Sequence, residues 1–168
     1  MSPWERDGVR LSDEWAAIVF PRVFKIDGSA REETVLPQGY VFVIVPTLRD
    51  PKYKLPGGKK NPGETPLATA VRELAGETGL KMKSEAFRYV GAAWVSRTKH
   101  WSILFTVDLN EDDVSWMHTQ HPENEGEIPR YFSIEEFYKM VREGGFLPYH
   151  FRRLEEKGLI LPLGRATG

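Results

Sequence analysis

A glycine-rich loop that leads into an amphipathic helix constrains this chain more than any other feature. Pro51–Gly63 contains seven Gly, Pro or Asn residues, a composition that predicts mostly loop. A helix is predicted over Pro66–Thr78, with Thr65 as its N-cap and Gly79 as its stop. One apolar face of this helix, expected to pack against a core, carries Leu67, Ala70, Val71 and Leu74.

Segments rich in β-branched and aromatic residues predict strands on both sides of this helix. The predicted strands are Trp15–Ile26, Thr34–Leu36, Gly39–Val45, Phe87–Val95, Trp101–Leu109 and Arg130–Phe132. Two further helices are expected near the C-terminus. One begins at a capping box formed by Ser133 and Glu136 and runs to about Glu143, and the other covers Pro148–Lys157. The acidic stretch Asn110–Pro129 is predicted to be a long loop.

These elements predict one α/β (α+β) domain over residues 1–168, in which a mixed β-sheet packs between helices. The polar residues 1–13 are expected to form a flexible N-terminal segment. Neither a signal peptide nor an apolar run of membrane-spanning length is visible, so we expect a cytoplasmic protein with no membrane contact. The net charge of −1 gives no sign of nucleic-acid binding. The absence of cysteine leaves oxygen and imidazole as metal ligands.

Two carboxylates on the predicted helix indicate chemistry. Glu73 and Glu77 are four residues apart, so they lie one turn apart on one face, beside the apolar stripe. With no lysine on that face, such a pair favours a divalent cation, and Mg²⁺ or Mn²⁺ bound through carboxylates and water fits this need. A solvent-exposed acidic helix would carry the same pair, so the pair alone does not decide between the two.

The spacing around the pair resembles the Nudix box, G-x5-E-x7-R-E-U-x-E-E-x-G-U, in which U is a bulky aliphatic residue. Eight of the nine specified positions match, namely Gly58, Glu64, Arg72, Glu73, Leu74, Glu77, Gly79 and Leu80. The exception is Gly76, which stands where the family usually has a glutamate that is a principal metal ligand. The resemblance extends more loosely from the strand at Gly39 to the helix at Ser133.

This resemblance implies a metal-dependent hydrolase that cleaves the diphosphate linkage of a nucleoside diphosphate derivative or nucleotide, with Mg²⁺ or Mn²⁺ as cofactor. Arg72 is expected to hold the carboxylates in place, and Glu64 to fix the loop–helix–loop or to contribute through water. A loop carboxylate, best matched by Glu125 with Glu123 and Glu127 as alternatives, is expected to complete the site. The implied catalytic residues are Glu73, Arg72 and Glu125, and the implied metal ligands are Gly58, Glu73, Glu77 and Glu125.

The phosphates of a small nucleotide-type substrate need cations, and the candidates are Lys59, Lys60, Arg97 and Lys99. Of these, Lys59 and Arg97 are our predicted substrate contacts, together with Trp94 as a base-stacking residue. The segment Trp15–Ile26 is a candidate surface for a homodimer. An alternative function is a nucleotide-binding or regulatory module with weakened catalysis, which Gly76 favours and the retained Glu73 and Glu77 oppose. The sequence leaves the substrate and the number of metal ions open.

Overall fold

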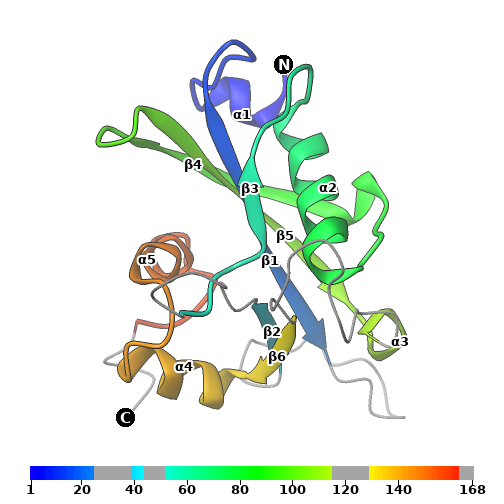
Figure 1. Ribbon diagram of the computed structural model, residues 1–168, viewed down its shortest axis with the longest axis vertical. Coiled ribbons are helices and arrows are strands. Elements are labelled where there is room, and N and C mark those ends of the chain that lie inside the picture. Colours follow the sequence, from blue (N-terminus) through cyan, green and yellow to red (C-terminus); the bar gives the residue numbers. More distant parts are fainter. Residues whose placement is uncertain (25–38, 44–51, 115–128, 163–168) are drawn as a thin grey trace.

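A computed structural model describes residues 1–24, 39–43, 52–114 and 129–162 (Figure 1). Its six-stranded sheet has the order β4-β5-β1-β2-β6, and β3 pairs with β1 beside β2. The strands are β1 (Trp15–Phe24), β2 (Gly39–Val43), β3 (Gly57–Lys59), β4 (Phe87–Val95), β5 (His100–Leu109) and β6 (Arg130–Ser133). The helices are α1 (Pro3–Arg6), α2 (Pro66–Thr78), α3 (Glu111–Val114), α4 (Ile134–Arg142) and α5 (Pro148–Glu156), and a 3-10 turn lies at Ser84–Ala86.

Strand β1 is the centre of the sheet. It runs parallel to β5 along one edge, while its other edge is shared by β3 over the first half and β2 over the second. Val19 donates its N–H to the Pro56 carbonyl at the end of the β3 contact. Alternation along the strand directs the next such position, Pro21, to the gap between β3 and β2. Because proline has no N–H, the gap leaves no unpaired donor there.

Side chains of β1 alternate between two cores, as a buried strand requires. Ala17 and Val19 join the core under α1 and α2, whereas Ile18 and Phe20 join the core under α4 and α5. Figure 1 shows α2 on one side of the sheet and α4 and α5 on the other. The predicted α+β fold, with a mixed sheet between helices, is therefore confirmed. No helix in the described ranges is long and apolar enough to span a bilayer.

Helix α2 has the predicted bounds and caps, because the Thr65 side chain accepts the Ala68 N–H and Gly79 ends the helix in the left-handed conformation. Its predicted apolar face is confirmed in part. Ala70 and Leu74 are fully buried, whereas Leu67 and Val71 are half-buried, with Leu67 packed against the core. The face toward the sheet also includes three polar residues, Thr69, Glu77 and Thr78. The threonines fit there because Thr69 accepts the Trp15 indole N–H and Thr78 donates to the Leu74 carbonyl.

Strand β3 is three residues long and lies within the segment Pro51–Gly63, which is predicted to be mostly loop. Gly57 faces β1 so closely that a Cβ on it would lie 2.9 Å from the Ile18 Cα. Only glycine allows this approach, so the residue type that indicated a loop is the one that permits the strand. The predicted strand Thr34–Leu36 lies outside the described residues, and the helix α3 falls inside the predicted loop Asn110–Pro129.

The N-terminal segment, predicted to be flexible, is folded against the sheet. Trp4 packs on Tyr89 and Phe105 at ring-centroid distances of 6.2 and 6.3 Å, and Val9 is buried in the same core. The segment predicted as a dimer surface is also placed differently. In the described part of that segment, β1 is the central strand, paired on both edges and with most of its side chains buried, so residues 15–23 offer little free surface to a second copy.

Helix α5 fixes the chain that leads into β3. Its His150 is buried, and the ring Nδ1 accepts the Leu55 N–H at 3.1 Å. Burial, with the positive charge of Lys54 nearby, lowers the pKa of His150 from 6.5 to about 3. The ring is therefore neutral in the folded protein at physiological pH, as an acceptor must be.

This burial predicts a specific acid sensitivity. Between pH 6.5 and 3 the unfolded chain binds a proton at His150 that the folded chain does not, so stability falls as the pH drops below about 6.5. His150→Asn retains a hydrogen-bond acceptor but does not titrate. Between pH 7.5 and 5.5, urea unfolding of the natural chain should lose about 1.4 kcal/mol more than unfolding of the variant. An equal loss in both proteins would show that His150 is not buried in its neutral form.

Candidate active site

An ion-pair network joins the loop after β3 to helix α2. The Arg72 guanidinium donates from Nε to Glu64 Oε2 at 2.6 Å and from Nη1 to Glu73 Oε1 at 2.7 Å. Its Nη2 donates to the Lys59 carbonyl at 2.9 Å and to Glu64 Oε1 at 3.0 Å. One side chain thus holds the end of β3, the loop carboxylate Glu64 and one of the two helix carboxylates, Glu73.

Glu64 is the brace of the loop. Besides Arg72, its carboxylate accepts the Asn61 N–H at 2.7 Å and the Thr69 hydroxyl at 3.1 Å. The hydrogen bond from Arg72 is the main reason that the pKa of Glu64 is lowered to about 2. These contacts join the loop to the helix, which is the geometry that the first of its two expected roles requires.

Glu73 lies directly against the backbone of Gly58. A Cβ added to Gly58 would be 2.6 Å from Glu73 Oε1 and 3.0 Å from Oε2. Any other residue at position 58 would therefore displace this carboxylate. The glycine pair has two separate functions, because Gly57 admits β1 and Gly58 admits the glutamate of α2.

Glu77 is a buried carboxylate, with 6% of its surface exposed. Its Oε1 accepts the Gly57 N–H at 2.9 Å, and its Oε2 lies 3.4 Å from the Lys54 ammonium. Desolvation raises the pKa of Glu77 to about 7, against the opposing effects of the Lys54 charge and the Gly57 hydrogen bond. The charge and hydrogen bonding of Glu73 raise it further. The two carboxylates predicted from their spacing therefore do come together beside Gly57 and Gly58.

The donors at this point fit a divalent metal ion. Two carboxylates crowded together, one of them taken out of water, are a site where a hard cation relieves both repulsion and desolvation. The backbone of Gly58 is next to the pair. Among the residues that the structure describes, no group of three or more His, Asp or Glu side chains is placed to hold a metal. Position 76, where the box usually has a glutamate, is glycine within α2.

The predicted substrate contacts are more dispersed. Lys59 is exposed at the end of β3, and Arg97 is exposed in the turn between β4 and β5. Trp94, 51% exposed, meets Trp101 edge to face at 5.5 Å across the same hairpin. No contact among the described residues joins Arg97 or Trp94 to the carboxylate pair, so their role stays a prediction.

Another predicted phosphate ligand, Lys60, is used structurally. Its ammonium donates to the carbonyls of Leu11 and Asp13 and lies 4.5 Å from the centre of the Trp15 ring. It therefore ties the loop after β3 to the N-terminal segment. Glu125 and its alternatives Glu123 and Glu127 lie outside the described residues.

Two residues that support the site were not predicted from the sequence. Lys54 approaches Glu77, and His150 holds the chain next to Lys54. The signal for His150 was present, since it shares a helix face with Leu154 and adjoins Phe151 on an otherwise polar helix. Lys54 carried no signal, because a lysine in a loop ahead of a glycine pair has many ordinary uses.

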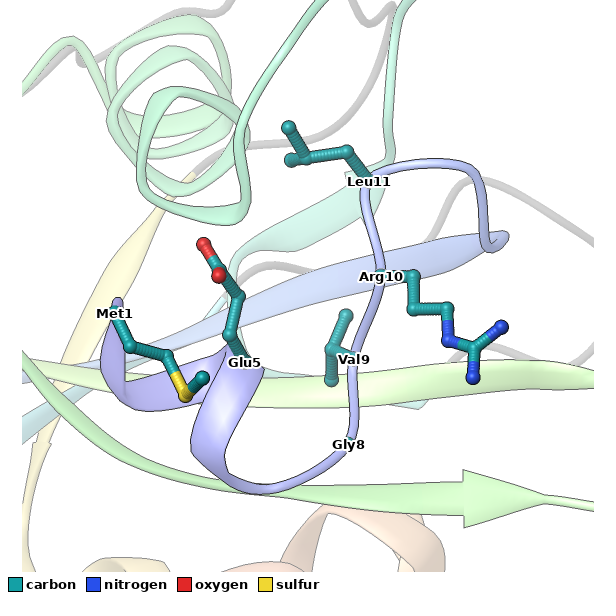
Figure 2. A pocket seen from close by; sticks show the side chains of 6 residues that line it. All are labelled: Met1, Glu5, Gly8, Val9, Arg10 and Leu11. Carbon is teal, nitrogen blue, oxygen red and sulfur yellow. The ribbon is translucent and has the colours of Figure 1, made fainter.

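A separate hollow of about 530 Å³ lies between α1 and the segment that follows it (Figure 2). It is lined by Met1, Glu5, Gly8, Val9, Arg10 and Leu11. None of the predicted site residues lines it, so it is distinct from the carboxylate pair.

Known proteins resemble this chain in sequence. A protein of Bacillus subtilis (strain 168) named "Putative 8-oxo-dGTP diphosphatase YtkD" is 28% identical over 115 residues, which cover 66% of this chain and 72% of that protein.

Solved structures share the fold. A NUDIX hydrolase from Nitrosomonas europaea matches with a TM-score of 0.53 and 15% identity over 88% of this chain and 90% of its own. A MutT/nudix family protein from Listeria innocua gives a TM-score of 0.54 and 17% identity over 77% of this chain and 84% of its own. A MutT/nudix family protein from Enterococcus faecalis gives a TM-score of 0.55 and 14% identity. This match covers 74% of this chain and 45% of the Enterococcus faecalis chain.

The family model of the NUDIX domain matches residues 29–151, which include β2, β3, the loop and all of α2. Together with the matching box and the shared fold, this match shows that the chain belongs to the NUDIX family.

Proposed function

We propose that this chain hydrolyses the diphosphate linkage of a small nucleotide-type molecule, a nucleoside diphosphate derivative or nucleotide, with Mg²⁺ or Mn²⁺ and in the cytoplasm. The observation that carries the proposal is the convergence of Glu73 and Glu77 beside the glycine pair, held by Arg72. Because the relative from Bacillus subtilis is named for 8-oxo-dGTP, that nucleotide is the first substrate to test.

In this proposal the metal ligands are Glu73, Glu77 and the Gly58 carbonyl. A divalent ion supplies charge neutralisation at the phosphoryl oxygens and a water of lowered pKa. Arg72 is a positioning residue, because its guanidinium fixes the orientation of Glu73 and ties it to Glu64. Glu73 has a second use, since a carboxylate beside the ion can also orient the attacking water.

The remaining assignments concern the substrate. Glu125 is proposed to join the site when substrate binds, as loops commonly do in hydrolases. Lys59, at the loop edge, is proposed to pair with phosphate, and Arg97 and Trp94 on the β4–β5 hairpin to contact the rest of the nucleotide. The exposure of all three described side chains leaves them accessible.

The first test of the proposal is Glu73→Gln. Removing the charge while keeping the volume and an oxygen acceptor for Arg72 should lower kcat by about 10²-fold or more, the typical effect of losing a general base or metal ligand. Stability to urea should change little. Turnover is measured as release of phosphorylated fragments from 8-oxo-dGTP and a panel of nucleotides, with Mg²⁺ and with Mn²⁺.

Glu135→Gln is the matched control, because it removes the same charge from an exposed position on α4. It should leave turnover unchanged. Nearly full activity in Glu73→Gln on a verified substrate would show that Glu73 has no part in the chemistry.

The second candidate function is a nucleotide-binding or regulatory module of the same fold. Gly76 favours it, because the family usually has a metal ligand at that position, and the described residues hold no group of three metal-binding side chains. Mg²⁺ accepts water as a ligand, so losing one carboxylate should weaken metal binding rather than abolish it.

Gly76→Glu separates the two functions. The added carboxylate should tighten Mn²⁺ binding in calorimetry, and turnover should rise if the chain is an enzyme. Gly76→Gln is the control, since it gives nearly the same gain in helix propensity, roughly 0.5–1 kcal/mol, without the charge.

Equal Mn²⁺ affinity in the two variants would mean that position 76 does not face the metal. Tighter Mn²⁺ binding in Gly76→Glu with no turnover on any substrate would favour the binding module.

A further inference from the structure

Both oxygens of the buried Glu77 carboxylate already have partners within the chain. Oε1 accepts the Gly57 N–H at 2.9 Å, and Oε2 faces the Lys54 ammonium at 3.4 Å. The Arg72 guanidinium is engaged by Glu64 and Glu73. Lys54 is therefore the cation that compensates Glu77 in the protein without metal.

The backbone of Lys54 is held in place by the residues on either side. Tyr53 donates its N–H to the Gly145 carbonyl at 2.8 Å and accepts the Leu147 N–H at 2.9 Å. Leu55 donates its N–H to His150 at 3.1 Å. Figure 1 shows this segment passing beside α5 on its way to β3. The ammonium therefore reaches Glu77 from a backbone position that is held by hydrogen bonds on both sides, not from a freely moving loop.

The Lys54 side chain can nevertheless move away from Glu77 into solvent. It is 25% exposed, whereas the Glu77 side chain is 7% exposed. A lysine with a long flexible stem can keep its methylenes in contact with the protein while its ammonium moves into water. The Glu77 carboxylate, by contrast, cannot move away without losing the hydrogen bond that it accepts from the Gly57 N–H.

We infer that Lys54 is an internal counterion that competes with divalent metal for Glu77, and so sets the metal affinity of the site and lets the protein fold without metal. The inference rests on the proposed function only in taking Glu77 as a metal ligand. A doubly charged ion on Glu77 Oε2 would be within a few ångströms of the ammonium, and this repulsion must expel Lys54 before the ion binds fully.

The competition between Lys54 and the metal should appear as a change in Mn²⁺ affinity. An opposite charge at such a distance changes the proton affinity of a carboxylate by about tenfold or more, and a metal ion that needs the same oxygen should respond at least as strongly. Lys54→Met, which keeps the stem but removes the charge, should therefore bind Mn²⁺ about tenfold more tightly in calorimetry.

Stability gives a readout that does not depend on activity. Without Lys54, the Glu77 carboxylate loses its nearest cation, so at pH 8, where the natural chain carries the Glu77 charge, Lys54→Met should melt at a lower temperature than the natural chain in metal-free buffer. Saturating Mn²⁺ should raise its Tm more than it raises that of the natural chain, because metal then supplies the missing charge. If Lys54→Met does not fold in metal-free buffer, it should still refold when Mn²⁺ is present.

Three controls isolate the effect. Lys54→Arg keeps the positive charge and should bind Mn²⁺ within about twofold of the natural chain, as should Lys139→Met, which removes an exposed charge from α4. The double variant Glu77→Gln/Lys54→Met should bind Mn²⁺ within about twofold of Glu77→Gln alone. In both proteins residue 77 has no charge for Lys54 and the metal to compete for.

The outcomes separate this inference from the proposed reaction. Tighter Mn²⁺ binding by Lys54→Met, present with Glu77 and absent with Gln at position 77, supports it even if no substrate is ever hydrolysed. Unchanged or weaker Mn²⁺ binding by Lys54→Met overturns it, even if the natural chain is an active hydrolase. Failure of Lys54→Met to fold with Mn²⁺ present also overturns it.

Discussion

The burial of the Glu77 carboxylate is the constraint on which the rest of the site depends. A charge taken out of water must be compensated, and the chain does so with a backbone donor from β3 and an ammonium from the segment ahead of it. Both partners must be held firmly for this to work. The pairing of β3 with β1 fixes Gly57, and the buried His150 fixes the neighbour of Lys54. Core packing and site chemistry are thus one arrangement.

Arg72 provides the second half of that arrangement. It joins Glu64 in the loop and Glu73 on the helix, and it also binds the last carbonyl of β3. Close approach is possible only because positions 57 and 58 have no side chain. The carboxylates of α2 are therefore set against the end of a strand whose position is fixed by the centre of the sheet, which is the rigidity that a metal site needs.

Much of this could be predicted from the sequence, because the signals were local. The caps Thr65 and Gly79 and the box of Ser133 with Glu136 depend on neighbours within a few residues, and all three are confirmed. The spacing of Glu73 and Glu77 likewise predicted their convergence. The buried face of α2 was predicted less well, because Thr69 and Glu77 face inward. Each forms a hydrogen bond there with a residue distant in sequence, Thr69 with Trp15 and Glu77 with Gly57.

Strand β3 and the role of Lys54 could not be predicted, for the same physical reason. A glycine-rich segment has no pattern of its own, and its structure is decided by β1 and α2 on either side of it. A loop lysine shows no preference for one of several acidic partners until the fold brings one to it. Local propensity predicts elements, whereas tertiary contacts choose which charges meet.

A crystal structure of the protein with Mn²⁺, with the ion located by its anomalous scattering, tests the central claim most directly. The account predicts a Mn²⁺ peak bounded by the carboxylates of Glu73 and Glu77 and the carbonyl of Gly58, with Arg72 still paired to Glu73. A peak at another part of the surface, or no peak between these groups at saturating Mn²⁺, would contradict it.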